Sequence, residues 1–187
     1  HQRAAAWKNP VIQTSENDPP CGLTILSLLS ILTGLVAGVI CGSFRLLLEW
    51  SDGLRTAFAL GPWHGFPAGL LLILASSLAS FLAALMVRRL APLASGSGIP
   101  HVEAVLAGST TPASAGLIPV KFVGGLLAIG SGLALGREGP SVQMGATAAN
   151  TIGRALRLGR SDCRVLLAAG AGAGLATAFN APAAGAI

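Results

Sequence analysis

The chain has 187 residues, of which 52% are hydrophobic and only 10% are charged, whereas a soluble domain carries about 25% charged residues. This composition excludes an ordinary soluble protein and predicts an all-α integral membrane protein with several spans. The formal net charge of +5 does not indicate nucleic-acid binding, because the basic residues lie between long apolar segments and report topology instead.

Two long spans are expected in the first half of the chain. Residues 1–20 form a polar N-terminal segment, and residues 21–187 form the transmembrane domain. The first span is expected over about 22–50 and the second over about 67–89. Each contains an apolar run long enough to cross a bilayer as a helix. A turn around residues 61–67, rich in glycine and proline, is expected between them.

The second half of the chain is more broken. From residue 91 to 115 the apolar pieces are too short to cross a membrane and are interrupted by glycine and proline. Helices are expected over about 116–135 and 139–157, separated by the sequence GREGP at 136–140. A glycine-rich span over about 163–180 follows, and the letters NAP are expected to open another helix.

Glycine and cysteine carry different information. Many of the 25 glycines recur at a spacing of four, as at Gly34 and Gly38 or Gly170 and Gly174, a spacing that lets helices approach closely in lipid. The 3 cysteines are odd in number and widely separated. They predict neither a disulfide framework nor a zinc site, and no metal or other cofactor is expected.

Arginines between the spans predict the orientation. Those expected on the cytoplasmic side are Arg88, Arg89, Arg154, Arg157, Arg160 and Arg164. The charges expected in the first loop cancel and suit the external side; they are Arg45, Glu49, Asp52 and Arg55. The N-terminus is then cytoplasmic. The 91–115 segment enters from the cytoplasmic side and GREGP from the external side, so that both approach the midplane.

Two short motifs predict the functional site. GSGIP (96–100) and GREGP (136–140) each place polar residues between glycines and close with proline, a pattern typical of a helix N-terminus. The first amides of a helix have no intrahelical partner, and the helix dipole places positive potential there. Within a membrane such amides need an occupant or a wet cavity. Two such ends therefore predict an anion site.

Ser97 and Glu138 are the candidate functional side chains. Ser97 would donate its hydroxyl to an anion beside the amides of Gly98 and Ile99; alternatively it merely caps its helix. Glu138 would occupy the place of the anion when it is deprotonated and withdraw when it is protonated. An acid inside a membrane is functional by default, although an ion pair with Arg137 or another buried partner is the alternative.

Four segments resemble a known family: GSGIPHVEAVL, PVKFVGG, GREGPSVQMGA and AGAGLATAFNAPAAGAI. They resemble, in order and spacing over about residues 20–187, the N-terminal half of the CLC chloride channels and proton/chloride antiporters of the prokaryotic branch. The resemblance implies half of an inverted-repeat bundle with tilted spans and re-entrant half-helices. It also implies a homodimer, with one pore per subunit, in the bacterial inner membrane.

The resemblance also implies residue roles. Glu138 would be the external gate and outer proton acceptor, and Ser97 the central hydroxyl ligand. The implied anion-binding residues are Gly96, Ser97, Gly98, Ile99, Pro100 and Gly139, and the supporting motif residues are Gly136, Arg137 and Pro140. The serine of GSGIP resembles the chloride-type members, since the fluoride exporters of the family depart from that motif. The implied function is proton-coupled chloride antiport, with a passive voltage-gated or pH-gated chloride channel as the alternative.

Features expected in the rest of such a subunit are missing. The chain contains no tyrosine, whereas the family has an anion-binding tyrosine in its C-terminal half. The inner proton-handling glutamate of the antiporters would fall after Ile187. Because the chain starts at His1 and stops within an apolar run, we expect a fragment of a longer membrane protein.

One rival comes from another class: an intramembrane serine hydrolase with Ser97 as nucleophile and His101 as base. Such enzymes need a histidine held precisely against the serine. His101 lies four residues later on the helix that Ser97 begins, so its ring is expected to point away from the hydroxyl. The sequence therefore predicts a transporter and not an enzyme.

Overall fold

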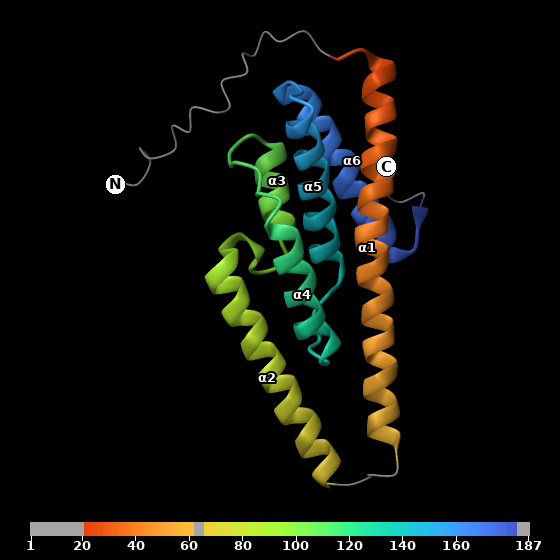
Figure 1. Ribbon diagram of the computed structural model, residues 1–187, viewed down its shortest axis with the longest axis vertical. Coiled ribbons are helices and arrows are strands. Elements are labelled where there is room, and N and C mark those ends of the chain that lie inside the picture. The colour runs from red at the N-terminus through yellow and green to blue at the C-terminus, as the bar shows by residue number, and fades with distance from the viewer. Residues whose placement is uncertain (1–20, 62–65, 183–187) are drawn as a thin grey trace, which may run out of the picture.

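The computed structural model describes residues 21–61 and 66–182, and in these residues it is all-helical (Figure 1). Its elements are α1 (Leu23–Leu60), α2 (Phe66–Leu90), the 3-10 turn η1 (Pro92–Ala94), α3 (Ile99–Leu106), α4 (Leu117–Gly130), α5 (Glu138–Ala155) and α6 (Arg160–Phe179). Three stretches are long and apolar enough to cross a membrane: Leu23–Leu60, Gly69–Leu90 and Arg160–Phe179. The prediction of a multi-span helical membrane protein is confirmed.

Helix α1 differs from its expected length. It continues for 38 residues to Leu60, so all four charges expected in the first loop lie on the helix instead. Arg45 pairs with Glu49 one turn later, and Asp52 pairs with Arg55. Pairs at these spacings support a helix, and the chain meets no strong breaker before Gly61. The predicted end of the first span was therefore wrong.

Other boundaries lie closer to the prediction. Helix α2 agrees with the expected 67–89 within one residue at each end. Helix α4 ends at Gly130, five residues before the expected 135, and Gly132 then adopts a φ of 107°, a conformation that favours glycine. The connection between α5 and α6 is only residues 156–159 and contains one arginine, Arg157, because the neighbouring arginines lie on the two helices. The expected helix after NAP lies mostly outside the described residues.

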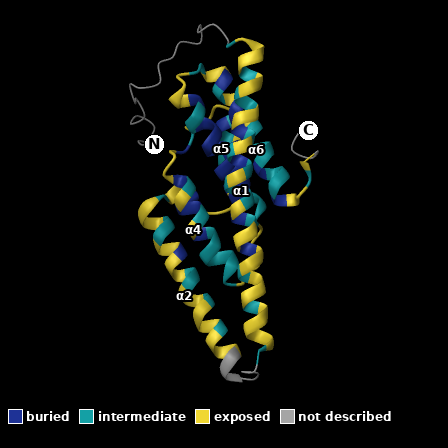
Figure 2. Cartoon of the chain, turned by 45° about the vertical axis from the view of Figure 1, so that its right-hand side comes forward, coloured by how far each residue is buried: buried dark blue, intermediate teal, exposed yellow. Residues whose placement is uncertain are grey.

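Helix α1 packs through one stripe of its surface. Its buried residues are Thr33, Ala37, Cys41, Phe44 and Leu48, at the three- and four-residue spacing of a single helix face. The rest of α1 and most of α2 expose large apolar side chains (Figure 2). These exposed faces suit contact with lipid or with other membrane helices.

Phe44 is the centre of the contact between α1, α4 and α5. Its ring lies 5.3 Å from that of Phe122, and it is fully buried with Met144 of α5 in one apolar cluster. A Cβ atom on Gly125 would lie 2.8 Å from the Phe44 Cζ atom, so glycine gives the ring its space. This cluster fixes α4 and α5 against the middle of α1.

Helices α5 and α6 touch through their backbones. A Cβ atom on Gly170 would lie 2.5 Å from the Gly145 carbonyl oxygen, and one on Gly174 would lie 2.8 Å from the Ser141 carbonyl carbon. The predicted packing role of this glycine pair is confirmed. On α1, by contrast, a Cβ atom on Gly34 or Gly38 would meet no described atom within 4 Å, so these glycines pack against nothing in the described chain.

Candidate anion site

Both predicted motifs begin helices. Proline-containing α3 starts at Ile99, directly after Gly98, and α5 starts at Glu138 with Pro140 in its first turn. The prediction that GSGIP and GREGP are helix N-termini is therefore confirmed. The amides that lead each helix have no intrahelical acceptor, because no earlier turn of helix supplies one.

The two helix starts are in direct contact. A Cβ atom on Gly139 would overlap the carbonyl oxygen of Ser97 and would lie 2.9 Å from the Ser97 Cα atom. Only glycine permits this approach. The loop that precedes α3 (residues 93–98, called the α3 loop below) therefore lies on the first turn of α5. The two segments are about forty residues apart in sequence.

Two glycines shape the α3 loop. Gly96 has a φ of 69° and Gly98 a φ of 85°, both in the left-handed region that favours glycine. The Ser97 hydroxyl between them accepts a hydrogen bond from the Ile99 amide at 3.2 Å. Ser97 precedes the N-cap residue Gly98 and engages the first amide of α3, which is close to the capping role considered as the alternative. Its side chain is exposed, and among the described residues no acceptor engages its O–H group, which leaves that hydrogen to donate.

Lys121 is a site-supporting residue that the sequence analysis missed. It lies on α4, its side chain is buried, and its ammonium donates to the carbonyl oxygens of Ala94 at 2.8 Å and Gly96 at 2.7 Å. A buried ammonium must be hydrogen-bonded, and these carbonyls are in the loop that carries Ser97. The sequence did carry a signal for this residue, because a charged side chain within an otherwise apolar membrane helix indicates a functional or structural role.

Gln143 is the second missed residue. Its amide nitrogen donates to the Leu93 carbonyl oxygen at 2.9 Å, and its side chain packs so closely on Gly98 that a Cβ atom there would lie 2.8 Å from the Gln143 Cβ atom. The Gln143 side chain of α5 therefore contacts both ends of the α3 loop, Leu93 and Gly98. Sequence spacing could not reveal this, because its partners lie on a different segment.

Glu138 lies at the first position of α5. Its carboxylate folds back over Gly136, where a Cβ atom would lie 3.0 Å from the Glu138 Cδ atom. Arg137 pairs with Glu49 of α1, with 3.6 Å between Nη1 and Oε1. Within the described part of the chain, no ion pair includes Glu138. The Arg137–Glu138 pair considered from the sequence is therefore not the one that forms.

His101 faces a small cavity between α3, α5 and α6. The cavity of about 10 Å³ is also lined by Gln143, Thr147 and Asn150. The Nε2 atom of His101 is buried without a hydrogen-bond partner among the described residues. The Ser97 hydroxyl accepts from Ile99, so the two side chains do not form the hydrogen bond that a hydrolase needs. In residues 21–61 and 66–182, no three metal-ligating side chains cluster.

Curated bacterial proteins are similar to most of this chain. It is 42% identical over 159 residues to the "H(+)/Cl(-) exchange transporter ClcA" of Vibrio cholerae serotype O1, a match that covers 84% of this chain and 34% of that protein. It is also 42% identical over 168 residues to the protein of the same name from Cronobacter sakazakii, covering 87% of this chain and 35% of that protein. The chain therefore spans about a third of the length of these relatives.

Two solved structures share the fold. One is a slow cyanobacterial Cl-/H+ antiporter, with a TM-score of 0.72 and 38% identity, covering 84% of this chain and 37% of that chain. The other is a CLC-type fluoride/proton antiporter, also with a TM-score of 0.72 but 28% identical, covering 87% of this chain and 38% of that chain. The all-helical arrangement thus matches part of an antiporter subunit.

A family model agrees with these similarities. The model for the voltage gated chloride channel matches residues 79–187, which is more than half of the chain and includes both helix-start motifs. This is a family of membrane transport proteins and not of enzymes, so the serine-hydrolase alternative is rejected. The chain belongs to the CLC family of voltage gated chloride channels.

Proposed function

We propose that the protein containing this chain transports chloride across the bacterial inner membrane in exchange for protons. The observation that carries the proposal is the contact of Gly139 with the Ser97 backbone. It brings two helix N-termini together, and each end offers amides and positive potential to an anion. Dipoles and a hydroxyl hold an anion less tightly than a fixed cation does, which suits passage.

The proposed anion site lies on the α3 loop and the first turn of α5. Ser97 donates its remaining hydroxyl hydrogen, and the Gly98 and Ile99 amides lie beside it. The residues proposed to form the anion site are Gly96, Ser97, Gly98, Ile99, Pro100 and Gly139. Gly136, Arg137 and Pro140 are proposed to support the second motif. Chloride is proposed over fluoride because serine lies between the two glycines of GSGIP.

Glu138 is the proposed gate and outer proton acceptor. Its carboxylate lies at the positive end of α5, and in its ionised form it competes with an anion for the same amides. Protonation removes the competing charge and lets the side chain leave. The ion pair of Arg137 with Glu49 supports this assignment, because it leaves Glu138 outside the ion pairs of the described chain.

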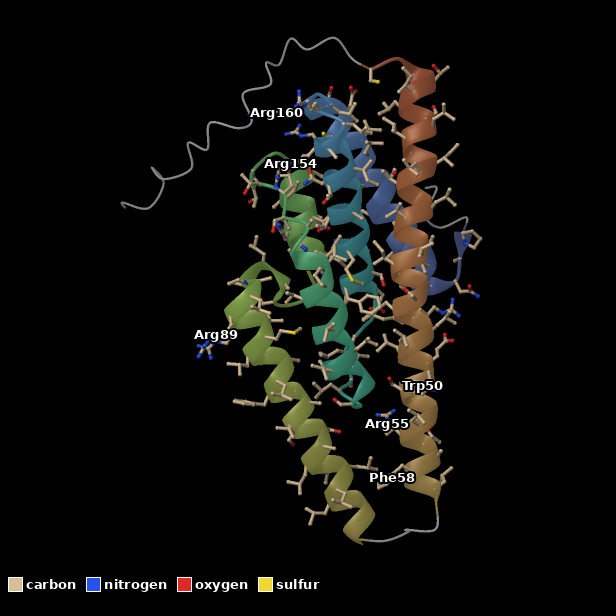
Figure 3. All side chains as sticks on the ribbon, viewed as in Figure 1. Trp50, Arg55, Phe58, Arg89, Arg154 and Arg160 are labelled. Atoms are coloured by element: carbon tan, nitrogen blue, oxygen red, sulfur yellow. The ribbon has the colours of Figure 1, made fainter. Side chains whose placement is uncertain are left out.

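The proposed topology has a cytoplasmic N-terminal segment (residues 1–20) and a transmembrane domain (residues 21–187). Figure 3 shows Arg154 and Arg160 at the end where α1 begins, and Trp50 and Phe58 toward the end where it finishes. Arginine on the cytoplasmic side agrees with this direction. The complete subunit is proposed to form a homodimer in the lipid bilayer, with chloride and protons as its small partners.

Liposome transport of the full-length protein tests the proposal. An imposed chloride gradient should drive proton movement against a proton gradient if the protein is an antiporter. Chloride flux without proton movement would instead favour the passive channel, an alternative that the name of the family keeps open. Absence of chloride flux in either form would reject the proposed function.

A further inference from the structure

One carboxylate oxygen joins α1 to the residue before Glu138. The Oε1 atom of Glu49 accepts a hydrogen bond from Nε of Arg45 at 2.8 Å and lies 3.6 Å from Nη1 of Arg137. Arg45 lies one turn earlier on the same helix, whereas Arg137 is the N-cap residue of α5. Among the described residues, Glu49 is therefore the α1 side chain that forms an ion pair with the Arg137 guanidinium.

The three side chains of this contact, those of Arg45, Glu49 and Arg137, are partly exposed. The exposed fractions of the side chains are 25% for Arg45, 47% for Glu49 and 40% for Arg137. Such groups keep contact with water, so their effect on a neighbouring charge is moderate and depends on salt. Arg137 is adjacent to Glu138 in the chain, so the direction in which its guanidinium is held determines how strongly it attracts the Glu138 carboxylate.

The other titratable groups described near the first turn of α5 have different partners or surroundings. Asp52 pairs with Arg55 farther along α1, and Arg55 lies against the connection between α4 and α5. Lys121 of α4 donates to carbonyl oxygens of the α3 loop. His101 of α3 lines a cavity with Gln143, farther along α5. The α6 stretch from residue 165 to 179, which includes the backbone contact with α5, has no titratable side chain.

We propose that Glu49 is a positioning residue that sets the pH at which Glu138 opens, by holding Arg137 away from it. This inference rests on the proposed gate. While Glu49 holds the guanidinium against α1, Arg137 adds little attraction to the Glu138 carboxylate. Without Glu49, Arg137 stabilises the ionised Glu138, and more acid is needed to open the pore.

The test is the pH profile of chloride flux through the full-length protein in liposomes. Glu49→Gln should move the pH of half-maximal flux down by about half to one pH unit, the effect of one added charge interaction at the protein surface. Asp52→Asn is the matched control, since it removes one negative charge from the same helix without contacting Arg137. Its shift should be less than half as large.

A double-variant cycle tests the route through Arg137. Arg137→Gln alone should move the half-maximal pH upward, and adding Glu49→Gln to it should cause no further shift. The proposal is overturned if Glu49→Gln shifts the profile equally with and without Arg137, or no more than Asp52→Asn does. Glu138→Gln separates the two proposals: if its flux keeps the pH dependence, the gate itself is wrong, whatever the Glu49 variants do.

Discussion

Gly139→Ala is expected to separate the two helix starts. The added Cβ atom would overlap the Ser97 carbonyl oxygen and lie 2.9 Å from the Ser97 Cα atom, whereas ordinary contact begins at 3.4 Å. The α3 loop must therefore move by at least about half an ångström. The neighbour is backbone and is itself fixed by Lys121 and Gln143, so it cannot yield as a flexible side chain would.

The expected magnitude follows from that rigidity. One methyl group forced into a packed contact costs about 1–3 kcal/mol. If the displaced loop lowers anion binding by the same free energy, affinity falls by about fivefold to more than a hundredfold. Chloride flux at low chloride concentration should fall in parallel, and the melting temperature in detergent should decrease.

Gly38→Ala is the matched control. It makes the same chemical change within a helix, but nothing described lies within 4 Å of the added atom. Alanine also favours a helix over glycine by up to about 1 kcal/mol, so this variant should retain flux and melt at the same temperature or higher. Equal flux through the two alanine variants would refute the reasoning, because the contact between the helix starts would then carry no function.

Three further changes test the site in the full-length protein. Ser97→Ala removes one donor, worth about 1 kcal/mol, and should weaken chloride binding about fivefold by calorimetry while the protein stays folded; unchanged affinity would count against a ligand role. Glu138→Gln should pass chloride without pH dependence and stop coupled proton movement, whereas complete loss of flux would indicate a structural role for the carboxylate. Lys121→Met leaves two carbonyl oxygens without a donor, which costs about 1–3 kcal/mol each and is offset in part by the loss of a buried charge; a lower melting temperature is expected, and an unchanged one would show that this cation does not hold the loop.

Glycine and proline made the helix starts predictable. Glycine and proline change the backbone within a few positions of themselves, so GSGIP and GREGP predict the starts of α3 and α5. Arg88 and Arg89 likewise predict the end of α2. The length of α1 was missed for the opposite reason. The four charges from Arg45 to Arg55 predict a loop when they are taken singly, whereas charges paired at helical spacing continue a helix.

The supports of the site could not be read from local patterns. Lys121 and Gln143 act on carbonyl groups of residues 93–96, which lie 25 to 50 positions away along the chain. Arg137 was considered as a partner of its neighbour Glu138, but packing of α1 offers Glu49 instead. In each case the tertiary arrangement decides which partner is within reach.

The burial of α5 has a consequence for how the protein is made. Every residue from Gly139 to Asn150 is buried, including Ser141, Gln143 and Thr147, and α5 is not among the three described stretches apolar enough to span a membrane. A translocon that partitions segments by hydrophobicity admits such a helix poorly by itself. We therefore expect α5 to enter the bilayer only after α6 has been synthesised. The two helices would insert together, in contact through their glycines. The polar side chains that α5 buries in the finished protein would thus delay the insertion of α5.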